Sequence, residues 1–92
     1  MSPIEAEFVD NTMARSEALL AATTLASVGI LGASEAEESA FRQGGRFMTM
    51  GFVMAHILAS RPACTTSAEV RAEVTAHLAQ RHAETATMEA VH

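Results

Sequence analysis

The sequence predicts an all-α fold, a small helical bundle of three principal helices in a single domain spanning residues 1–92. Three stretches of helical apolar periodicity each follow a capping box, in which a hydroxyl residue precedes a Glu by three positions. No run of alternating β-branched residues suggests a strand. Alanine, the strongest helix former, supplies 19 of the 92 residues, which favours helices throughout.

The first helix is expected over residues 3–28. Ser2 supplies the N-cap hydroxyl and Glu5 completes the capping box, so the helix should begin directly after Ser2. At the other end, Gly29 suits the left-handed position that terminates many helices. Asp10-Asn11 would split this helix if either side chain capped a new helix start, because both compete for nearby backbone amides.

The second helix is expected over residues 35–60, behind the capping box of Ser34 and Glu37. Pro62 ends it, because the residue before a proline avoids helical geometry and proline donates no backbone hydrogen bond. Gly44-Gly45 lies in the middle of this helix, and each glycine costs about 1 kcal/mol relative to alanine. A kink or break at this pair is therefore an alternative to a continuous helix.

The third helix is expected over residues 67–90, behind the capping box of Thr66 and Glu69. Its helical periodicity continues without interruption by Gly or Pro. Breaks at Asp10-Asn11 or Gly44-Gly45 would raise the number of helices from three to four or five.

The second helix carries a stripe of small residues, which is the most informative surface pattern in the sequence. These residues recur at spacings of four and seven and let another helix backbone approach closely. They are Ala36, Ala40, Gly44, Gly51 and Ala55. Beyond Arg46 the helix is apolar nearly all round, so either the monomer encloses it or its extra face enters a partner. The predicted partner interface consists of Ala40, Gly44, Met48, Gly51, Phe52 and Ala55.

Charge is unevenly distributed along the chain. Residues 1–40 contain seven acids and one Arg, whereas residues 39–68 contain three Arg and no acid. Arg42, Arg46 and Arg61 are therefore a candidate site for a phosphate, a carboxylate or an acidic partner surface. The alternative is that they pair with the protein's own carboxylates, several of which lie nearby in the sequence.

No catalytic or metal site is predicted, and no cofactor is expected. His77 and His82 point about 140° apart on a helix, which prevents them from binding one metal ion together. The Glu-x-x-His spacing of Glu89 and His92 occurs once, whereas helical metal sites use two such motifs and further glutamates. Cys64 has no base beside it in the sequence, and we therefore do not expect an enzyme.

The overall charge and hydropathy exclude several other classes of protein. A net charge of −5 argues against general nucleic-acid binding, which requires a cationic surface. The uncharged stretches 18–34 and 47–60 are shorter than the roughly 20 apolar residues of a membrane helix, so no membrane association is expected. Residues 1–17 carry four acids and one Arg, unlike a secretory signal, and one cysteine cannot form an internal disulfide. We therefore expect a soluble cytoplasmic protein.

These features favour a non-enzymatic helical module for protein–protein interaction. It would act as a homo-oligomer, as an adaptor, or as an inhibitor that docks on a larger protein assembly. One alternative is a small sensor of anions or nucleotides built on the three arginines. Another is a helix-turn-helix DNA-binding regulator, for which the last predicted helix supplies neither a break nor a basic face.

Overall fold

The protein is helical almost throughout its described length. The computed structural model describes the backbone of residues 1–91 and the side chains of residues 1–88. Its helices are α1 (Pro3–Ala26), the short π-helix η1 (Ser27–Leu31) that continues α1, α2 (Glu35–Ala59) and α3 (Ser67–Val91). The predicted all-α fold with three principal helices is confirmed. None of the described helices is long and apolar enough to cross a membrane.

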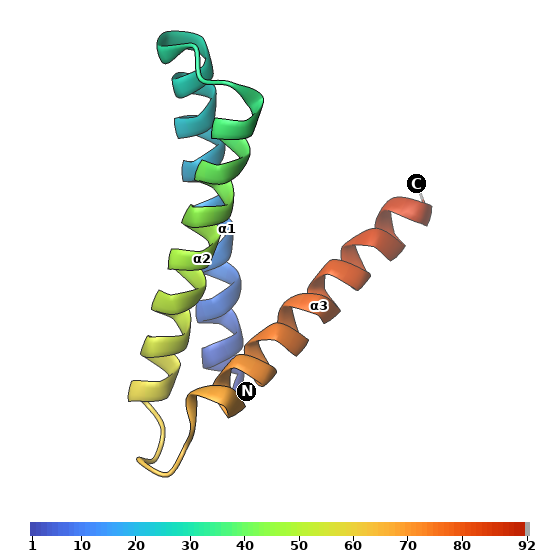
Figure 1. The fold of residues 1–92 in the computed structure, drawn as a ribbon. Helices are drawn as coiled ribbons and strands as arrows, with labels where there is room; N and C mark the ends of the chain where they lie inside the picture. The colour runs from blue at the N-terminus through green and yellow to red at the C-terminus, as the bar shows by residue number, and fades with distance from the viewer. Residues whose placement is uncertain (92) are drawn as a thin grey trace.

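The helices form a hairpin with one projecting arm (Figure 1). α1 and α2 run antiparallel and side by side, and α3 starts at the open end of this hairpin and leads away from it. The core lies where the three helices meet, at the base of the hairpin. Its fully buried side chains are Val9, Val53, Ile57, Val70 and Val74. Because these side chains come from all three helices, the core determines where the arm begins.

Side-chain caps determine where the helices begin. Ser2 Oγ accepts a hydrogen bond from the amide of Glu5, whose carboxylate accepts one from the amide of Ser2. Ser34 and Glu37 repeat this reciprocal arrangement ahead of α2, and the Thr66 hydroxyl caps α3 by accepting one amide hydrogen bond. All three starts therefore rest on interactions within one helical turn.

Neither of the two candidate breaks interrupts its helix. α1 is continuous through Asp10-Asn11, because the Asp10 carboxylate turns toward α3 and binds His77 (2.8 Å) instead of capping a local amide. α2 is continuous through Gly44-Gly45, and Leu20 of α1 packs directly against Gly45. The chain therefore has three principal helices, and the alternatives with four or five do not apply.

The helical path from α1 ends three residues later than the sequence predicted. Gly29 is the expected left-handed residue, but it lies inside η1, and Gly32 adopts the left-handed conformation instead (φ 67°). The amide of Gly32 donates to the carbonyl of Ser27, so the wide π turn carries the chain past Gly29. The prediction of Gly29 was wrong because two glycines lie near this end and either one suits a helix terminus by itself.

The molecule is more open than a compact domain of its size. Its Cα radius of gyration is 15.6 Å, whereas roughly 12 Å is expected for a compact chain of this length. Its accessible surface is 6563 Å², whereas roughly 5,100 Å² is expected for a compact protein of 9.7 kDa. The difference means that roughly 1,400 Å² of additional surface lies exposed.

Candidate functional site

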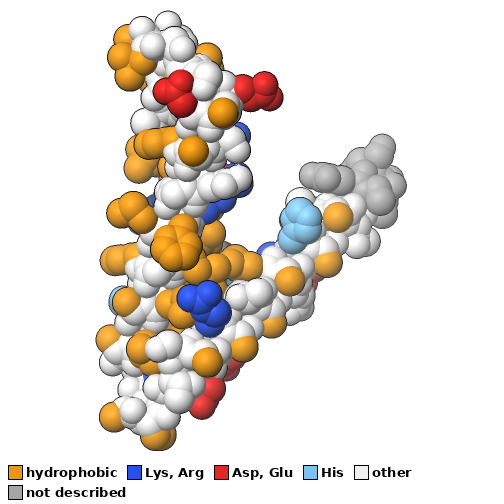
Figure 2. Space-filling view, in the orientation of Figure 1, with side chains coloured by type: hydrophobic (Ala, Val, Ile, Leu, Met, Phe, Trp, Pro, Cys, Tyr) orange, Lys and Arg blue, Asp and Glu red, His pale blue; other side chains and the backbone are white. Residues whose placement is uncertain are grey.

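The outer face of α2 is an apolar surface that lies open in the structure. We use this name for the exposed residues Ala40, Gly44, Phe47, Met48, Gly51, Phe52 and Ala55. The exposed fractions of Phe47, Met48 and Phe52 are 75%, 76% and 61%. Figure 2 shows hydrophobic side chains along the side of the hairpin that faces away from α3. All six residues of the predicted partner interface lie on this face.

Helical geometry keeps charge off the outer face of α2. The charged residues of α2 within 39–60 are Arg42 and Arg46, which lie on the side facing α1. Arg46 binds Glu17 of α1 through two hydrogen bonds (2.6 and 3.1 Å), and Arg42 lies one turn before it. His56 also turns toward α1, where it stacks on a phenylalanine ring at a centroid distance of 4.1 Å. Roughly 30 Å of α2 therefore presents an exposed side without a charge.

The glycines of α2 divide between its two sides. Gly44 and Gly51 lie on the outer face, where an added Cβ atom would meet no other atom within 4 Å. Gly45 faces α1, where an added Cβ atom would overlap Cδ2 of Leu20. Close approach of α1 to α2 therefore occurs at Gly45, which lies outside the predicted stripe. The glycines of the stripe itself meet no other helix of the described chain.

Two large exposed side chains extend the apolar surface beyond the residues predicted from the sequence. Phe47 lies three residues after Gly44 and four before Gly51, so helical spacing alone places it in the stripe. Leu19 of α1 is 68% exposed and lines a surface hollow together with Phe52. The sequence carried a signal for Phe47, whereas Leu19 joins this surface only because α1 packs beside α2.

Arg42 and Arg46 border a shallow surface hollow that also contains Glu35 and Glu38. The hydrogen bond from Arg46 lowers the pKa of the Glu17 carboxyl, and the nearby charge of Arg42 acts in the same direction. Arg46 is thus paired with Glu17, whereas the Nε atom of Arg42 is buried without a hydrogen-bond partner in the described part of the chain. An added anion at this hollow would have to compete with the protein's own acids.

Arg61 lies just beyond the opposite end of α2, roughly 28 Å from Arg42 along the axis of this helix. Its guanidinium binds Glu5 of α1 through two hydrogen bonds (3.1 and 3.2 Å) and also binds Glu73 of α3. The pKa of Glu5 is lowered to about 2, and the hydrogen bond from Arg61 contributes most to this shift. The structure therefore does not bring the three arginines together, and Arg61 joins α1 to α3.

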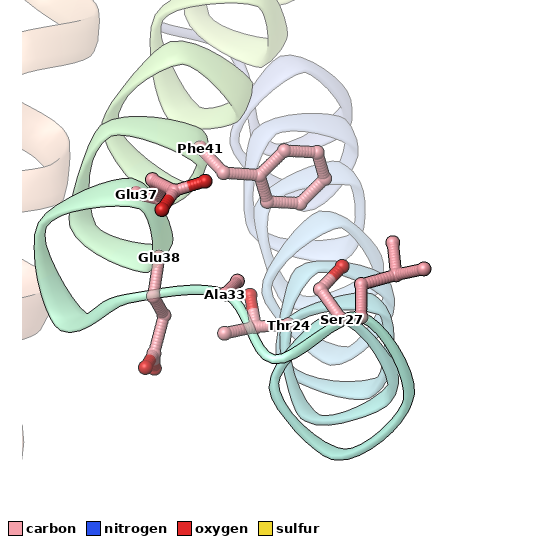
Figure 3. A pocket seen from close by; sticks show the side chains of 7 residues that line it. Thr24, Ser27, Ala33, Glu37, Glu38 and Phe41 are labelled. Carbon is pink, nitrogen blue, oxygen red and sulfur yellow. The ribbon is translucent and has the colours of Figure 1, made fainter.

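A hollow of about 240 Å³ lies at the tip of the hairpin (Figure 3). Phe41 lines the hollow from α2, Thr24 lines it from α1 and Ser27 from η1. The Thr24 hydroxyl is buried without a hydrogen-bond partner in the described part of the chain. The volume is below the roughly 300–1,000 Å³ of ordinary ligand pockets, so we assign no ligand to this hollow.

The groups considered for catalysis or metal binding lie apart. In the described part of the chain, no three His, Cys, Asp or Glu side chains gather closely enough to hold a metal ion. His77 binds Asp10 across the gap between α3 and α1, and Cys64 is exposed in the loop before α3. The pattern of Glu89 and His92 lies outside the described side chains.

No protein family, curated protein or solved structure matches this chain. The outer face of α2 combines exposure, apolar character and a regular helical spacing, and a second group of exposed apolar side chains, Leu25, Ile30 and Leu31, lies at the tip of the hairpin.

Proposed function

We propose that the protein is a non-enzymatic protein–protein interaction module that works through the outer face of α2. The supporting observation is an exposed helix side without charge, on which Phe47, Met48 and Phe52 stand open to water. Exposure of apolar surface is unfavourable, and contiguous patches of it mark interaction sites. The module would act in the cytoplasm as a homo-oligomer, as an adaptor or as an inhibitor of a larger assembly.

The chemistry of the outer face suits a helical partner. Gly44 and Gly51 let the backbone of another helix come close, and Phe47 and Met48 between them supply apolar area. Burial of one such large side chain contributes about 1.5–3 kcal/mol. Leu19 at the border adds to the area that a partner would cover.

The two alternative functions have less support. A sensor of anions needs several free arginines, whereas Arg46 and Arg61 each bind carboxylates of the same chain and Arg42 alone of the three has no such partner among the described residues. A helix-turn-helix regulator needs a basic recognition helix, whereas α3 is continuous and its Arg81 is paired with Asp10 and Glu84. Binding of a protein is therefore the function we propose.

Site-specific photo-crosslinking tests this proposal. A photoreactive amino acid replaces Met48 on the outer face and, in a matched control, replaces Ala79, which is exposed on α3. After irradiation of cells that produce the protein, we expect a covalent protein adduct from position 48 and none from position 79. Absence of an adduct at position 48, or equal adducts at both positions, would refute an interaction role for this face.

A further inference from the structure

We infer that the outer face of α2 binds the same face of a second copy of this chain, with the two α2 helices antiparallel about a two-fold axis. The inference rests on the proposed function and names its partner. Three observations support it: the spacing of the small residues, the absence of charged residues on the outer face of α2, and the surface area that the monomer leaves exposed.

Four of the five residues in the small-residue stripe have a spacing that reads the same in both directions along α2, and the fifth, Ala36, lies outside this symmetric set. The intervals are four, seven and four, for the residues Ala40, Gly44, Gly51 and Ala55. The centre of this pattern falls between Phe47 and Met48. A two-fold axis at the centre places Ala40 opposite the partner's Ala55, and Gly44 opposite the partner's Gly51. Two-fold interfaces need this self-complementarity, because every contact occurs twice with the two roles exchanged.

The open space around the stripe allows this pairing. Apart from the adjacent residues and the nearby backbone of α2 itself, no atom lies within 4 Å of a Cβ atom built on Gly44 or Gly51, so a partner backbone has room to approach there. Phe47 and Met48 then meet their own copies beside the axis. Figure 1 shows that α3 leaves the hairpin at its base, which keeps the arm away from most of α2.

The electrostatics of the outer face also favour a second copy. Like surfaces that carry charge repel each other, but this face has no charged residue, because Arg42 and Arg46 lie on the side facing α1. Within α2, burial of the face against itself removes no ion from water, and Arg15 of α1 lies at the border, where it lines the same hollow as Leu19 and Met48. A charged partner would leave its own ions unpaired against this face. The chemistry therefore selects an apolar partner, and the face itself is one.

The surface that the whole monomer leaves exposed exceeds what one side of a standard dimer interface needs. The monomer exposes roughly 1,400 Å² more than a compact protein of its mass, and a standard interface removes about 800 Å² from each partner. The outer face of α2, through Phe47, Met48 and Phe52, and the neighbouring Leu19 contribute part of this exposed area. The rest of the excess lies on other surfaces, including the projecting part of α3.

Gly51→Leu tests the contact, because its effect differs between monomer and dimer. In the monomer the new side chain has open space and leucine is the better helix former, so helicity should be kept or raised. In the dimer it enters the space of the partner's Gly44, and we expect the dimer Kd to rise by at least about tenfold. The control Ala79→Leu should leave Kd unchanged. Light scattering over a range of concentrations measures the mass, and far-UV circular dichroism measures the helicity.

Complementary charges at Met48 test whether the partner is a second copy. Met48→Glu and Met48→Arg each place like charges beside the two-fold axis, so each variant alone should have the mass of one chain. Mixed in equal amounts, they should form a species with the mass of two chains. Dimers that persist in both single variants, or a mixture that stays monomeric, would overturn the inference.

The crosslinked adduct at position 48 separates this inference from the proposed function. An adduct with twice the mass of the chain, together with a dimeric wild type, supports both. An adduct of another mass, together with a monomeric wild type, overturns the second copy and leaves the interaction module standing. A monomeric wild type without any adduct at position 48 overturns both.

Discussion

Arg61 connects segments that are distant in the sequence. It follows α2 directly and binds Glu5 of α1 and Glu73 of α3. The two hydrogen bonds to Glu5 fix the planes of both groups, and both side chains are partly buried, which makes the pair firmer than an exposed ion pair. One side chain thus helps to hold the base of the hairpin together.

We predict that Arg61→Ala lowers the Tm at pH 7 and makes the Tm fall less as the pH is lowered. The pKa of Glu5 in the folded protein is about 2, below its ordinary value of 4.5. The pair therefore stabilises the fold fully above pH 4.5 and progressively less as the pH falls toward 2. Thermal melts between pH 7 and 2 should show a smaller fall for Arg61→Ala than for the wild type. The control Arg71→Ala, at an exposed residue of α3, should keep the wild-type slope.

We predict that alanine has different effects at the two adjacent glycines of α2. Gly44→Ala should stabilise the fold by roughly 0.5–1 kcal/mol, since alanine favours helix and its Cβ atom meets open space. Gly45→Ala should not stabilise the fold in this way, because the new Cβ atom would force Leu20 to shift. Leu20 is only 8% exposed and is packed within the hairpin. Urea unfolding in a Met48→Glu background measures both changes in the monomer. Equal stabilisation at both positions would contradict close packing at Gly45.

At the scale of single elements, the end of the first helix depends on which glycine is left-handed. We predict that Gly32→Ala destabilises the fold by about 1–2 kcal/mol, because its φ of 67° is strained for any residue with a Cβ atom. Gly29→Ala should instead stabilise by roughly 0.4–1 kcal/mol, because it has room and a helical backbone. Urea unfolding of the two variants checks the signs. Reversed signs would mean that the helix ends at Gly29.

α2 differs from an ordinary surface helix in what it offers to water. One side packs into the core through Val53 and Ile57, as in any amphipathic helix. The opposite side should then be polar, but it carries Phe47, Met48 and the small residues of the stripe. A helix that is apolar on both sides is suited to burial, and in this fold only one side is buried. This exposed apolar side is the reason why we propose an interaction role for α2.

At the scale of the whole molecule, α3 is an arm that is attached only at its start. Val70 and Val74 are fully buried and Leu78 is half-buried against the core. From Ala79 to Met88 every residue is exposed, and Arg81 forms an ion pair with Asp10 of α1, beyond which no ion pair joins the described part of α3 to α1. The remainder of the arm therefore depends on its own helix propensity.

We predict that amide hydrogen exchange divides α3 near Arg81. The part beyond it is shorter than the roughly 12–15 residues that an isolated helix needs in water, so its amides should exchange rapidly. Amides around Val74 should exchange as slowly as those around Val53, because both regions share the core. Exchange measured by mass spectrometry over time checks this difference. Equal protection along all of α3 would contradict a free arm.

The sequence alone was enough to predict the all-α class, the helix starts and the small-residue stripe. Each of these features depends on residues within one or two helical turns. The caps at Ser2, Ser34 and Thr66 join residues three positions apart, and the stripe follows from the helical repeat. Such local interactions need no knowledge of where the other helices lie.

The tertiary structure decided how these elements meet. Glu5 and Arg61 are 56 residues apart, and nothing local to either residue selects the other. The packing of Leu20 on Gly45, the position of Leu19 beside α2 and the direction of α3 depend likewise on the joint fit of side chains from several helices. Whether the stripe faced the core or the solvent depended on the same fit. Helical spacing defines which residues share a side of α2, but only packing determines which side is covered.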